Sequence, residues 1–367
     1  MDKVSFFPVG NGDTVLFEVE GNTVMTDIHY RAKTEDESED DYYPLREDIK
    51  EACKTSDGYF LDCFVSTHPD KDHVLGFGTV FHTGDPSDYK PDDETILIKE
   101  IWVSKYGSDP NYETEESKAL IDEIKRRKKL SGTADDNIDG NRIKIFSLDD
   151  EDQVEGEVND SLRWRLLAPN DSEADIEDSG DETSPNSCND SSLVIRWEYT
   201  KNNKKEYILL GGDAGYKIWE RIRNDFSDQD LKWSVLLAPH HCSRCSLQFK
   251  NDDGVYEDSE DAISALSNIN GKGFVVSSSK KVKKDQDRPP AWEAKQKYLN
   301  ILEESHENGH KDRFLNPQTY GDKEKPKPVV FRLSENGLVL DKASKSENKS
   351  SNKYSAAVTV PSTYGSQ

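Results

Sequence analysis

The sequence lacks any apolar run that approaches the length of a membrane span, so it predicts no membrane-crossing helix. We also expect no secretory leader, because Met1-Asp2-Lys3 runs directly into a strand-like apolar segment. Cysteine is scarce, and the five cysteines are an odd number, which argues against a framework of disulfides. Together these absences predict a cytoplasmic protein with reduced thiols and no membrane partner.

Hydrophobic residues are also few. They make up 33% of the chain, the same share as the charged residues, which is low for a globular protein. Dense apolar runs at 207–210 and 235–237 nevertheless exclude disorder throughout. We therefore expect residues 1–342 to form one domain with acidic loop insertions, followed by a flexible polar tail over 343–367, although the length also allows two domains.

Positive charge is outnumbered, since 48 Lys and Arg face 73 Asp and Glu and give a net charge of −25. Such a field repels nucleic acid and anionic membranes at long range, which argues against a protein that coats DNA nonspecifically. It does not exclude a phosphodiester substrate, because metal ions and local basic patches act at short range.

Short apolar segments bounded by turn residues predict strands, and the first three form a β-meander. The predicted strands cover 4–9, 14–19, 23–28, 59–66, 96–104, 142–146, 162–168, 192–199, 206–210, 231–238 and 274–278, with a closing hairpin over 328–341. The sequence also predicts helices over 46–54, 113–130, 216–226 and 292–304, and within 113–130 the apolar residues Leu120, Ile121 and Ile124 recur at helical spacing. This order predicts the α/β class, with two mixed sheets and helices on the outside.

Four potential metal ligands fall within six residues directly after the predicted strand 59–66: His68, Asp70, Asp72 and His73. A loop that follows a strand lets these side chains converge, whereas a helix would splay them. Imidazole and carboxylate together suit zinc, manganese or iron. The alternative interpretation is an ordinary polar loop.

Two further candidate segments also follow apolar strands. Asp213 lies between glycines in the segment 211–215, and His240 and His241 follow Pro239. Taken alone, Asp213 is more typical of a turn or a helix N-cap, and a histidine pair after proline is more typical of a structural role. A carboxylate between two glycines can bridge two ions. All three strand-end segments taken together favour a metal site.

The segment His68-x-Asp70-x-Asp72-His73 resembles the signature of the metallo-β-lactamase superfamily, in the variant typical of the ComEC-type branch, where Asp70 stands in place of a histidine. Four other segments are similar to motifs of that branch, and together they span about residues 4–341. They are Val9-Gly10-Asn11-Gly12-Asp13, Asn189-Asp190-Ser191-Ser192-Leu193-Val194, Leu210-Gly211-Gly212-Asp213 and Pro239-His240-His241-Cys242-Ser243.

The resemblance implies an αββα sandwich, the metallo-β-lactamase fold, with one or two divalent metal ions, Zn or Mn, at the sheet ends. It implies one ion near His68 and Asp70 and a second near Asp72, His73 and His240, with Asp213 between them. In this interpretation Asp72 also orients the water. His241 is a proton donor or supports a ligand from behind, and the two neighbouring histidines can exchange roles.

This chain departs from the family pattern in three places. No clear histidine between 82 and 240 supplies a third ligand for the first ion, which leaves Asn189 or a water. Cys242 replaces the usual glycine, and with Cys245 it forms a Cys-x-x-Cys pair that suits zinc or, as we favour, two reduced thiols. His29 stands where a glycine usually follows the third strand, and we interpret it as a polar loop residue rather than a ligand.

Two basic clusters, 125–129 and 280–284, are either solvated faces or phosphate contacts, and the second would border the predicted site. The favoured function is a phosphodiesterase or nuclease that acts on nucleic acid or nucleotides, which in family terms suits bacterial antiphage defence or nucleic-acid turnover. The alternatives are a hydrolase of small esters, lactones or phosphoesters, and a non-catalytic module whose acidic loops, predicted at 33–43, 147–160 and 171–182, dock a basic protein partner.

Overall fold

The computed structural model describes residues 1–33, 42–110, 113–174, 188–321 and 326–341. The predicted polar tail lies outside these ranges, as does most of the acidic segments predicted at 33–43 and 171–182. Among the described helices, none combines the length and the apolar character that crossing a membrane requires.

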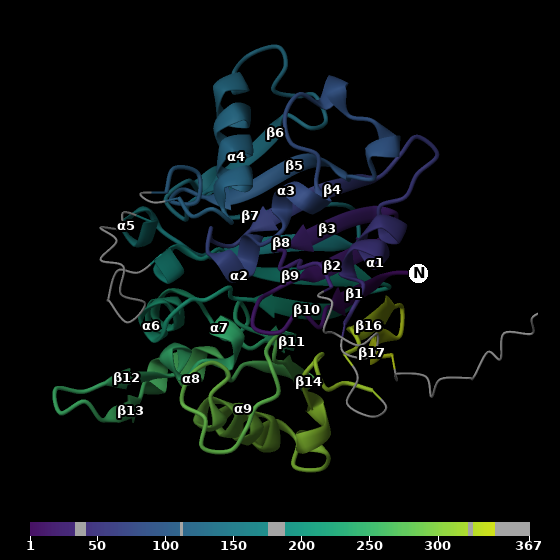
Figure 1. The fold of residues 1–367 in the computed structure, drawn as a ribbon. Helices are drawn as coiled ribbons and strands as arrows, with labels where there is room; N and C mark the ends of the chain where they lie inside the picture. Colours follow the sequence, from purple (N-terminus) through teal and green to yellow (C-terminus); the bar gives the residue numbers. More distant parts are fainter. Residues whose placement is uncertain (34–41, 111–112, 175–187, 322–325, 342–367) are drawn as a thin grey trace, which may run out of the picture.

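Two mixed β-sheets form the centre of the molecule (Figure 1). The first has the order β17-β16-β1-β2-β3-β4-β5-β6. Its strands are β1 (Lys3–Phe6), β2 (Val15–Val19), β3 (Asn22–Thr26), β4 (Phe60–Ser66), β5 (Leu97–Ser104), β6 (Arg142–Phe146), β16 (Val329–Ser334) and β17 (Gly337–Leu340). Strands β3 to β6 run parallel, and the remaining pairs are antiparallel.

The second sheet has the order β15-β14-β11-β10-β9-β8-β7. Its strands are β7 (Glu155–Glu157), β8 (Leu162–Ala168), β9 (Val194–Lys201), β10 (Lys204–Leu210), β11 (Trp233–Leu237), β14 (Ile269–Val276) and β15 (Phe314–Leu315). Strands β10, β11, β14 and β15 are parallel, so their carboxyl ends lie at one edge. A separate hairpin pairs β12 (Gln248–Lys250) with β13 (Tyr256–Asp258).

Helices cover the outer face of each sheet (Figure 1). On the first sheet they are α1 (Leu45–Ala52), α2 (Lys71–Val74), α3 (Phe77–Val80) and α4 (Lys118–Leu130). On the second they are α6 (Tyr216–Asp225), α8 (Glu260–Ala265) and α9 (Trp292–Ser305). The expected α/β class and αββα sandwich are therefore confirmed.

Short helical turns occupy the connections. The α-helical ones are α5 (Asp171–Ala174) and α7 (Pro239–Cys242). The 3₁₀ turns are η1 (Pro86–Asp88), η2 (Pro91–Asp93), η3 (Glu151–Gln153), η4 (Cys188–Ser191), η5 (Arg244–Ser246) and η6 (His310–Arg313).

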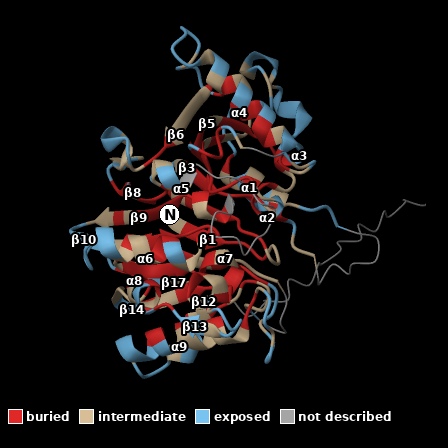
Figure 2. Ribbon diagram, turned by 90° about the vertical axis from the view of Figure 1, so that its left-hand side faces the viewer, coloured by how far each residue is buried: buried red, intermediate tan, exposed pale blue. Residues whose placement is uncertain are grey.

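Three hydrophobic clusters stabilise this layering. One fills the space between the sheets, where Trp197 lies 5.1 Å from Phe17 and 6.0 Å from Trp102, centroid to centroid. The other two lie between each sheet and its own helices. Figure 2 shows the buried residues concentrated in the sheets and the exposed residues on the outer helix faces. Burial of apolar area on both faces of both sheets is the main stabilising term.

Local hydrogen bonding shifts some predicted boundaries. Helix α4 begins five residues later than expected, because Thr114 and Ser117 exchange backbone and side-chain hydrogen bonds in a turn before it. The β9–β10 hairpin is tighter than expected, since Asn202 and Asn203 both adopt left-handed φ values of 48° and 64°, as a two-residue turn requires. Strands β7, β12, β13 and β15 and helix α8 were not predicted, and each is six residues or shorter.

Candidate metal centre

The segments that follow β4, β10 and β11 converge at one edge of the sandwich. Strands β10 and β11 are parallel neighbours, so the Gly-Gly-Asp turn and the histidine pair leave the second sheet side by side. There His240 N donates to Gly212 O at 3.0 Å. Across the sandwich, Leu193 N donates to Thr67 O at 3.0 Å, which ties the end of β4 to the start of β9. Backbone hydrogen bonds therefore hold these distant segments together.

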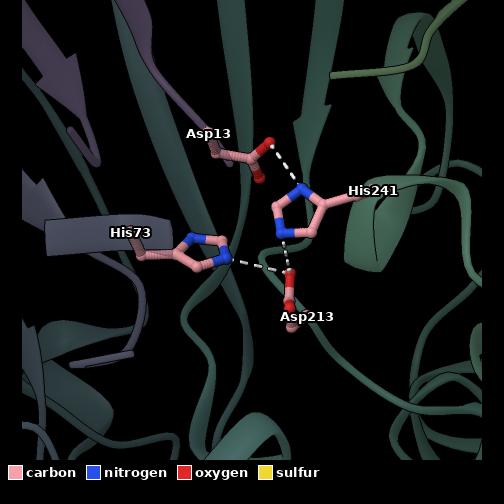
Figure 3. A group of neighbouring side chains, drawn as sticks. All are labelled: Asp13, His73, Asp213 and His241. Carbon is pink, nitrogen blue, oxygen red and sulfur yellow. Dashed lines mark ion pairs between the residues drawn. The ribbon is translucent and has the colours of Figure 1, made fainter. Parts of the chain in front are cut away.

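Four buried side chains meet at this edge: Asp13, His73, Asp213 and His241 (Figure 3). Each offers one ligand atom, and these atoms all lie within 4.8 Å of one another. His73 Nε2 lies 3.1 Å from Asp213 Oδ1, and His241 Nε2 lies 3.7 Å from the same oxygen. On its other side, His241 Nδ1 lies 3.5 Å from Asp13 Oδ1. The group combines two imidazoles with two carboxylates around one small space.

Both histidines are held from behind by hydrogen-bond acceptors. Asp27 is fully buried, and its Oδ2 lies 2.7 Å from His73 Nδ1 while its carboxylate also accepts from Thr67 N at 2.8 Å and Thr67 Oγ1 at 2.7 Å. His241 Nδ1 lies 3.2 Å from the carbonyl oxygen of Ser278. In the tautomer that satisfies these acceptors, each Nδ1 carries the proton and each Nε2 presents a lone pair to the cluster, as metal-binding histidines do.

The backbone that presents the second histidine is strained. His240, His241 and Cys242 have φ values of 50°, 50° and 66°, three consecutive left-handed residues that are not glycine. Each such residue costs of order 1–3 kcal/mol, and such strain gathers at functional sites. Burial of the His241 ring and its polar contacts offset this cost and keep the turn in place.

The electrostatics of the cluster call for positive charge. Burial lowers the pKa of His73 and His241, yet Asp213 and the other nearby carboxylates outweigh it and raise both pKa values well above the ordinary range. Burial raises the pKa of Asp213, and the charges of His240, His241 and His73 outweigh it and hold that pKa well below its ordinary value. A divalent cation would balance these carboxylates and leave the histidines neutral, each with a lone pair on Nε2.

Unsatisfied buried atoms support the same conclusion. Among the described residues, the atoms without a hydrogen-bond partner include Asp13 Oδ1, His68 Nε2, His73 Nε2 and Asp213 Oδ1, all at this edge. Buried polar atoms are normally hydrogen-bonded, and here several of them in one place meet only as ion pairs, which favours a cation among them. Mixed nitrogen and oxygen donors suit zinc, manganese or iron. These residues therefore fit a divalent cation.

The structure brings most of the predicted site residues to this edge. Asp72 Oδ2 lies 3.2 Å from His241 Nε2, and His240 Nε2 lies 3.5 Å from Asp213 Oδ2. The His68 ring packs beside that of His73, at 4.1 Å between centroids. Of the two adjacent histidines, His241 rather than His240 joins His73 in the buried cluster.

The first of the two expected ion positions is less complete. His68 Nε2 lies 3.7 Å from Asp70 Oδ2. Its Nδ1 is near Thr67 Oγ1 at 3.1 Å and Ser192 Oγ at 3.4 Å. The expected completion of this position by Asn189 stays a prediction.

Two residues near the centre were not predicted as part of it. Asp13 was noted only as the end of the Gly-Asn-Gly-Asp turn, and a carboxylate directly before a buried strand was the signal that could have identified it. His29, expected to be a polar loop residue rather than a ligand, lies in a loop near the centre, and burial lowers its pKa to about 4.

The cysteine pair takes no part in this cluster. Cys242 is buried, its pKa is raised to about 12 by burial, and it is a free thiol like Cys245.

Of the basic residues on α4, Arg126 and Arg127 both pair with Glu123. Among the described residues, the metal-type cluster thus contains only imidazole and carboxylate ligands.

No protein-family model matches the chain, and no curated relative matches it. Several solved structures are similar to it at low identity. One is an isothiocyanate hydrolase from Delia radicum gut bacteria, with 14% identity, a TM-score of 0.37 and coverage of 86% of this chain and 95% of that one. Igni18, a metallo hydrolase from the archaeon Ignicoccus hospitalis, has 14% identity, a TM-score of 0.35 and coverage of 90% and 100%.

A third is MEM-A1, a subclass B3 metallo-β-lactamase from a soil metagenome library, with 9% identity, a TM-score of 0.30 and coverage of 64% of this chain and 75% of that one. Likeness at these scores does not identify an activity. The functional argument therefore rests on the chemistry of the site itself.

Proposed function

We propose that this protein is a metal-dependent hydrolase of the metallo-β-lactamase type that cleaves phosphoester bonds, with phosphodiesters as the favoured substrates. The observation that carries the proposal is the buried cluster of Asp13, His73, Asp213 and His241, whose ligand atoms lie within 4.8 Å of one another. A site of this kind is costly to bury without a cation. The ComEC-type resemblance of the surrounding motifs supports the phosphodiester preference.

His73, Asp213 and His241 would hold the cation, with Asp13 next to them. A divalent ion in such a site lowers the pKa of water and stabilises negative charge that develops on a phosphoryl oxygen. Asp27 serves as a positioning residue, because it fixes the tautomer and the orientation of the His73 ring.

Asp72 is placed to orient the attacking water as a hydrogen-bond acceptor. Burial raises its pKa, but the hydrogen bond to His241 and nearby positive charge outweigh this and lower the pKa, so the carboxylate is ionised at neutral pH. Its side chain is 37% exposed, whereas the Asp213 side chain is only 4% exposed. The Asp72 carboxylate can therefore meet both solvent and substrate.

His240 is the more exposed of the paired histidines, with 14% of its side chain accessible against 2% for His241. Its Nε2 lies 3.5 Å from Asp213 Oδ2 at the mouth of the cluster. This position suits a hydrogen bond to the leaving oxygen of the substrate. His241, with carboxylates on both sides of its ring, is better placed as a ligand.

The test is hydrolysis of bis(p-nitrophenyl) phosphate by purified protein stripped of metal and then resupplied with zinc or manganese. We expect metal-dependent turnover that falls about a hundredfold or more in Asp72→Ala and Asp213→Asn. Asp88→Ala is the matched control, because Asp88 is an exposed carboxylate on η1.

The same preparations are then offered single- and double-stranded DNA, RNA, cyclic nucleotides and chromogenic carboxylic esters. Cleavage of esters without cleavage of any phosphoester would contradict the phosphoester assignment. Elemental analysis that finds no stoichiometric metal, even after resupply, would contradict the hydrolase assignment and favour a non-catalytic module.

A further inference from the structure

Two members of the metal cluster come from opposite sheets. Asp13 lies in the turn between β1 and β2 of the first sheet, and His241 follows β11 of the second. Asp13 Oδ1 and His241 Nδ1 are nevertheless 3.5 Å apart, and both side chains are buried. Side chains keep such a distance only where the segments that carry them are joined by further contacts. Two polar side chains, Asn11 and Ser278, make these contacts.

Ser278 follows the end of β14 and contacts both partners. Its side-chain Oγ donates to Gly12 O at 2.6 Å, and Gly12 immediately precedes Asp13. Its backbone carbonyl oxygen lies 3.2 Å from His241 Nδ1. Because Ser278 is only 3% exposed, bulk water competes little for either contact. One buried residue thus touches the Asp13 turn with its side chain and the His241 ring with its backbone.

Asn11 makes the second connection. Its Oδ1 accepts from Lys280 N at 2.9 Å, and its Nδ2 donates to Pro289 O at 2.9 Å. These two partners lie at the ends of the segment 280–289, which leads from β14 towards α9. An amide side chain supplies the one acceptor and the one donor that this pair of contacts requires. Asn11 therefore ties the Asp13 turn to the same part of the second sheet that Ser278 contacts.

The turn is also fixed on its other side. Asp13 N donates to Asp72 O at 3.2 Å, and a Cβ on Gly12 would lie 2.7 Å from that same oxygen. The turn is thus packed between the segment that carries Asp72 and the end of β14. Loss of the Ser278 contact releases it on one side only, so we expect a change in the position of Asp13 rather than loss of the fold.

We propose that Asn11 and Ser278 are positioning residues for the metal centre, which hold the Asp13 carboxylate against the His241 ring and so set the angle at which His241 Nε2 meets the cation. Loss of a group that orients a metal ligand typically lowers metal affinity by about 10- to 100-fold. This inference rests on the metal centre of the proposed function, but it does not depend on which bond is cleaved there.

Titration of the metal-free full chain with cobalt(II) tests the assignment, because the visible absorption of this ion reports the arrangement of its ligands. Ser278→Ala and Asn11→Ala should each bind cobalt about tenfold more weakly, with altered absorption bands. Ser279→Ala is the matched control. Ser279 is also buried, but its Oγ contacts Ser277 Oγ at 2.7 Å and Lys280 O at 3.0 Å rather than the Asp13 turn. Its replacement should keep the wild-type affinity and spectrum.

Thermal melts of the metal-free proteins separate positioning from stability. Ser278→Ala and Ser279→Ala should lose similar amounts of Tm, because each loses a buried hydrogen bond, while only the first changes the cobalt spectrum. If Ser278→Ala fails to fold, Asn11→Ala decides the question by the same criteria, because the Asn11 side chain is only partly buried.

A wild-type cobalt spectrum and affinity in both Asn11→Ala and Ser278→Ala would overturn the assignment. An equal loss of cobalt binding in Ser279→Ala would also overturn it, because any buried hydrogen bond of this segment would then have the same effect. If the wild type binds cobalt and the variants change its spectrum, but no phosphoester is hydrolysed, only the proposed function fails. If bis(p-nitrophenyl) phosphate is hydrolysed and the variants keep the wild-type spectrum, only the positioning assignment fails.

Discussion

Replacement of Asp27 by asparagine tests whether the metal centre depends on the orientation of His73. The Asp27 carboxylate accepts three hydrogen bonds, from Thr67 N at 2.8 Å, Thr67 Oγ1 at 2.7 Å and His73 Nδ1 at 2.7 Å. Asparagine has nearly the same shape and tolerates the left-handed φ of 55° at this position. It has only one acceptor oxygen, however, and the backbone N–H of Thr67 is already directed at one of the two oxygen positions.

The amide NH₂ of Asp27→Asn then faces His73 Nδ1, which can accept this hydrogen bond only in the opposite tautomer. That tautomer places a proton on Nε2, where the cation would bind. Loss of such a supporting carboxylate typically lowers metal affinity by about 10- to 100-fold, or about 1.4–2.8 kcal/mol. Calorimetric titration of the metal-free protein with zinc or manganese measures this directly, and thermal melts with and without metal should show a smaller metal-induced rise in Tm.

Asp62→Asn is the matched control. Asp62 also accepts from a threonine backbone N–H and hydroxyl, at 2.8 and 3.2 Å from Thr23, and it pairs with Lys99 rather than with a histidine. Its replacement should leave metal affinity unchanged. Wild-type affinity in Asp27→Asn, or an equal loss in Asp62→Asn, would refute the role assigned to Asp27.

Three further predictions concern stability and its pH dependence. Gly12→Ala should lower the free energy of unfolding by about 2–4 kcal/mol in denaturant melts, because its Cβ would lie 1.7 Å from Nδ1 of His29, whereas Gly10→Ala, with open space around it, should lose only about 1 kcal/mol. Arg127→Ala should lower the free energy of unfolding by about 3–5 kcal/mol, because it leaves the buried carboxylate of Glu123 with one partner fewer. Lys129→Ala on the same helix should leave the free energy of unfolding nearly unchanged. Equal losses of stability in the two variants would contradict this prediction. Burial raises the pKa of Glu123, but its arginine partners outweigh this and hold the pKa below the ordinary 4.5. The ionised Glu123 carboxylate therefore contributes its full stabilisation above pH 4.5, and this stabilisation is lost as pH falls through the lower pKa of the folded state. The Tm difference between wild type and Glu123→Gln should accordingly shrink in acid. A difference that stays constant with pH would contradict the assignment.

The sequence by itself determined the class of fold. Alternating and continuous apolar runs predicted the longer strands, and helices were predicted where α1, α4, α6 and α9 lie, with helical spacing of apolar residues in α4. Such patterns report which side of an element faces the core. Short elements such as β7, β13 and β15 escaped prediction, because two or three residues carry no period. Their existence depends on the pairing partner that the fold supplies.

For the candidate centre, the sequence identified His73, Asp213 and the paired histidines, because imidazole and carboxylate after apolar strands are an unusual local pattern. It gave no reason to choose Asp13, whose turn looked like a simple connection between strands. Only the tertiary structure placed this carboxylate 3.5 Å from His241 Nδ1, because the turn between β1 and β2 packs against the end of the second sheet.

The sequence also could not reveal which histidine of the pair faces inward, since neighbouring residues share the same local pattern. The left-handed turn through 240–242 decides it, and that turn persists only because the surrounding sheets bury and hydrogen-bond the second ring. Local pattern thus determined which elements form, whereas side-chain geometry across the sheets depended on long-range contacts that no local window contains.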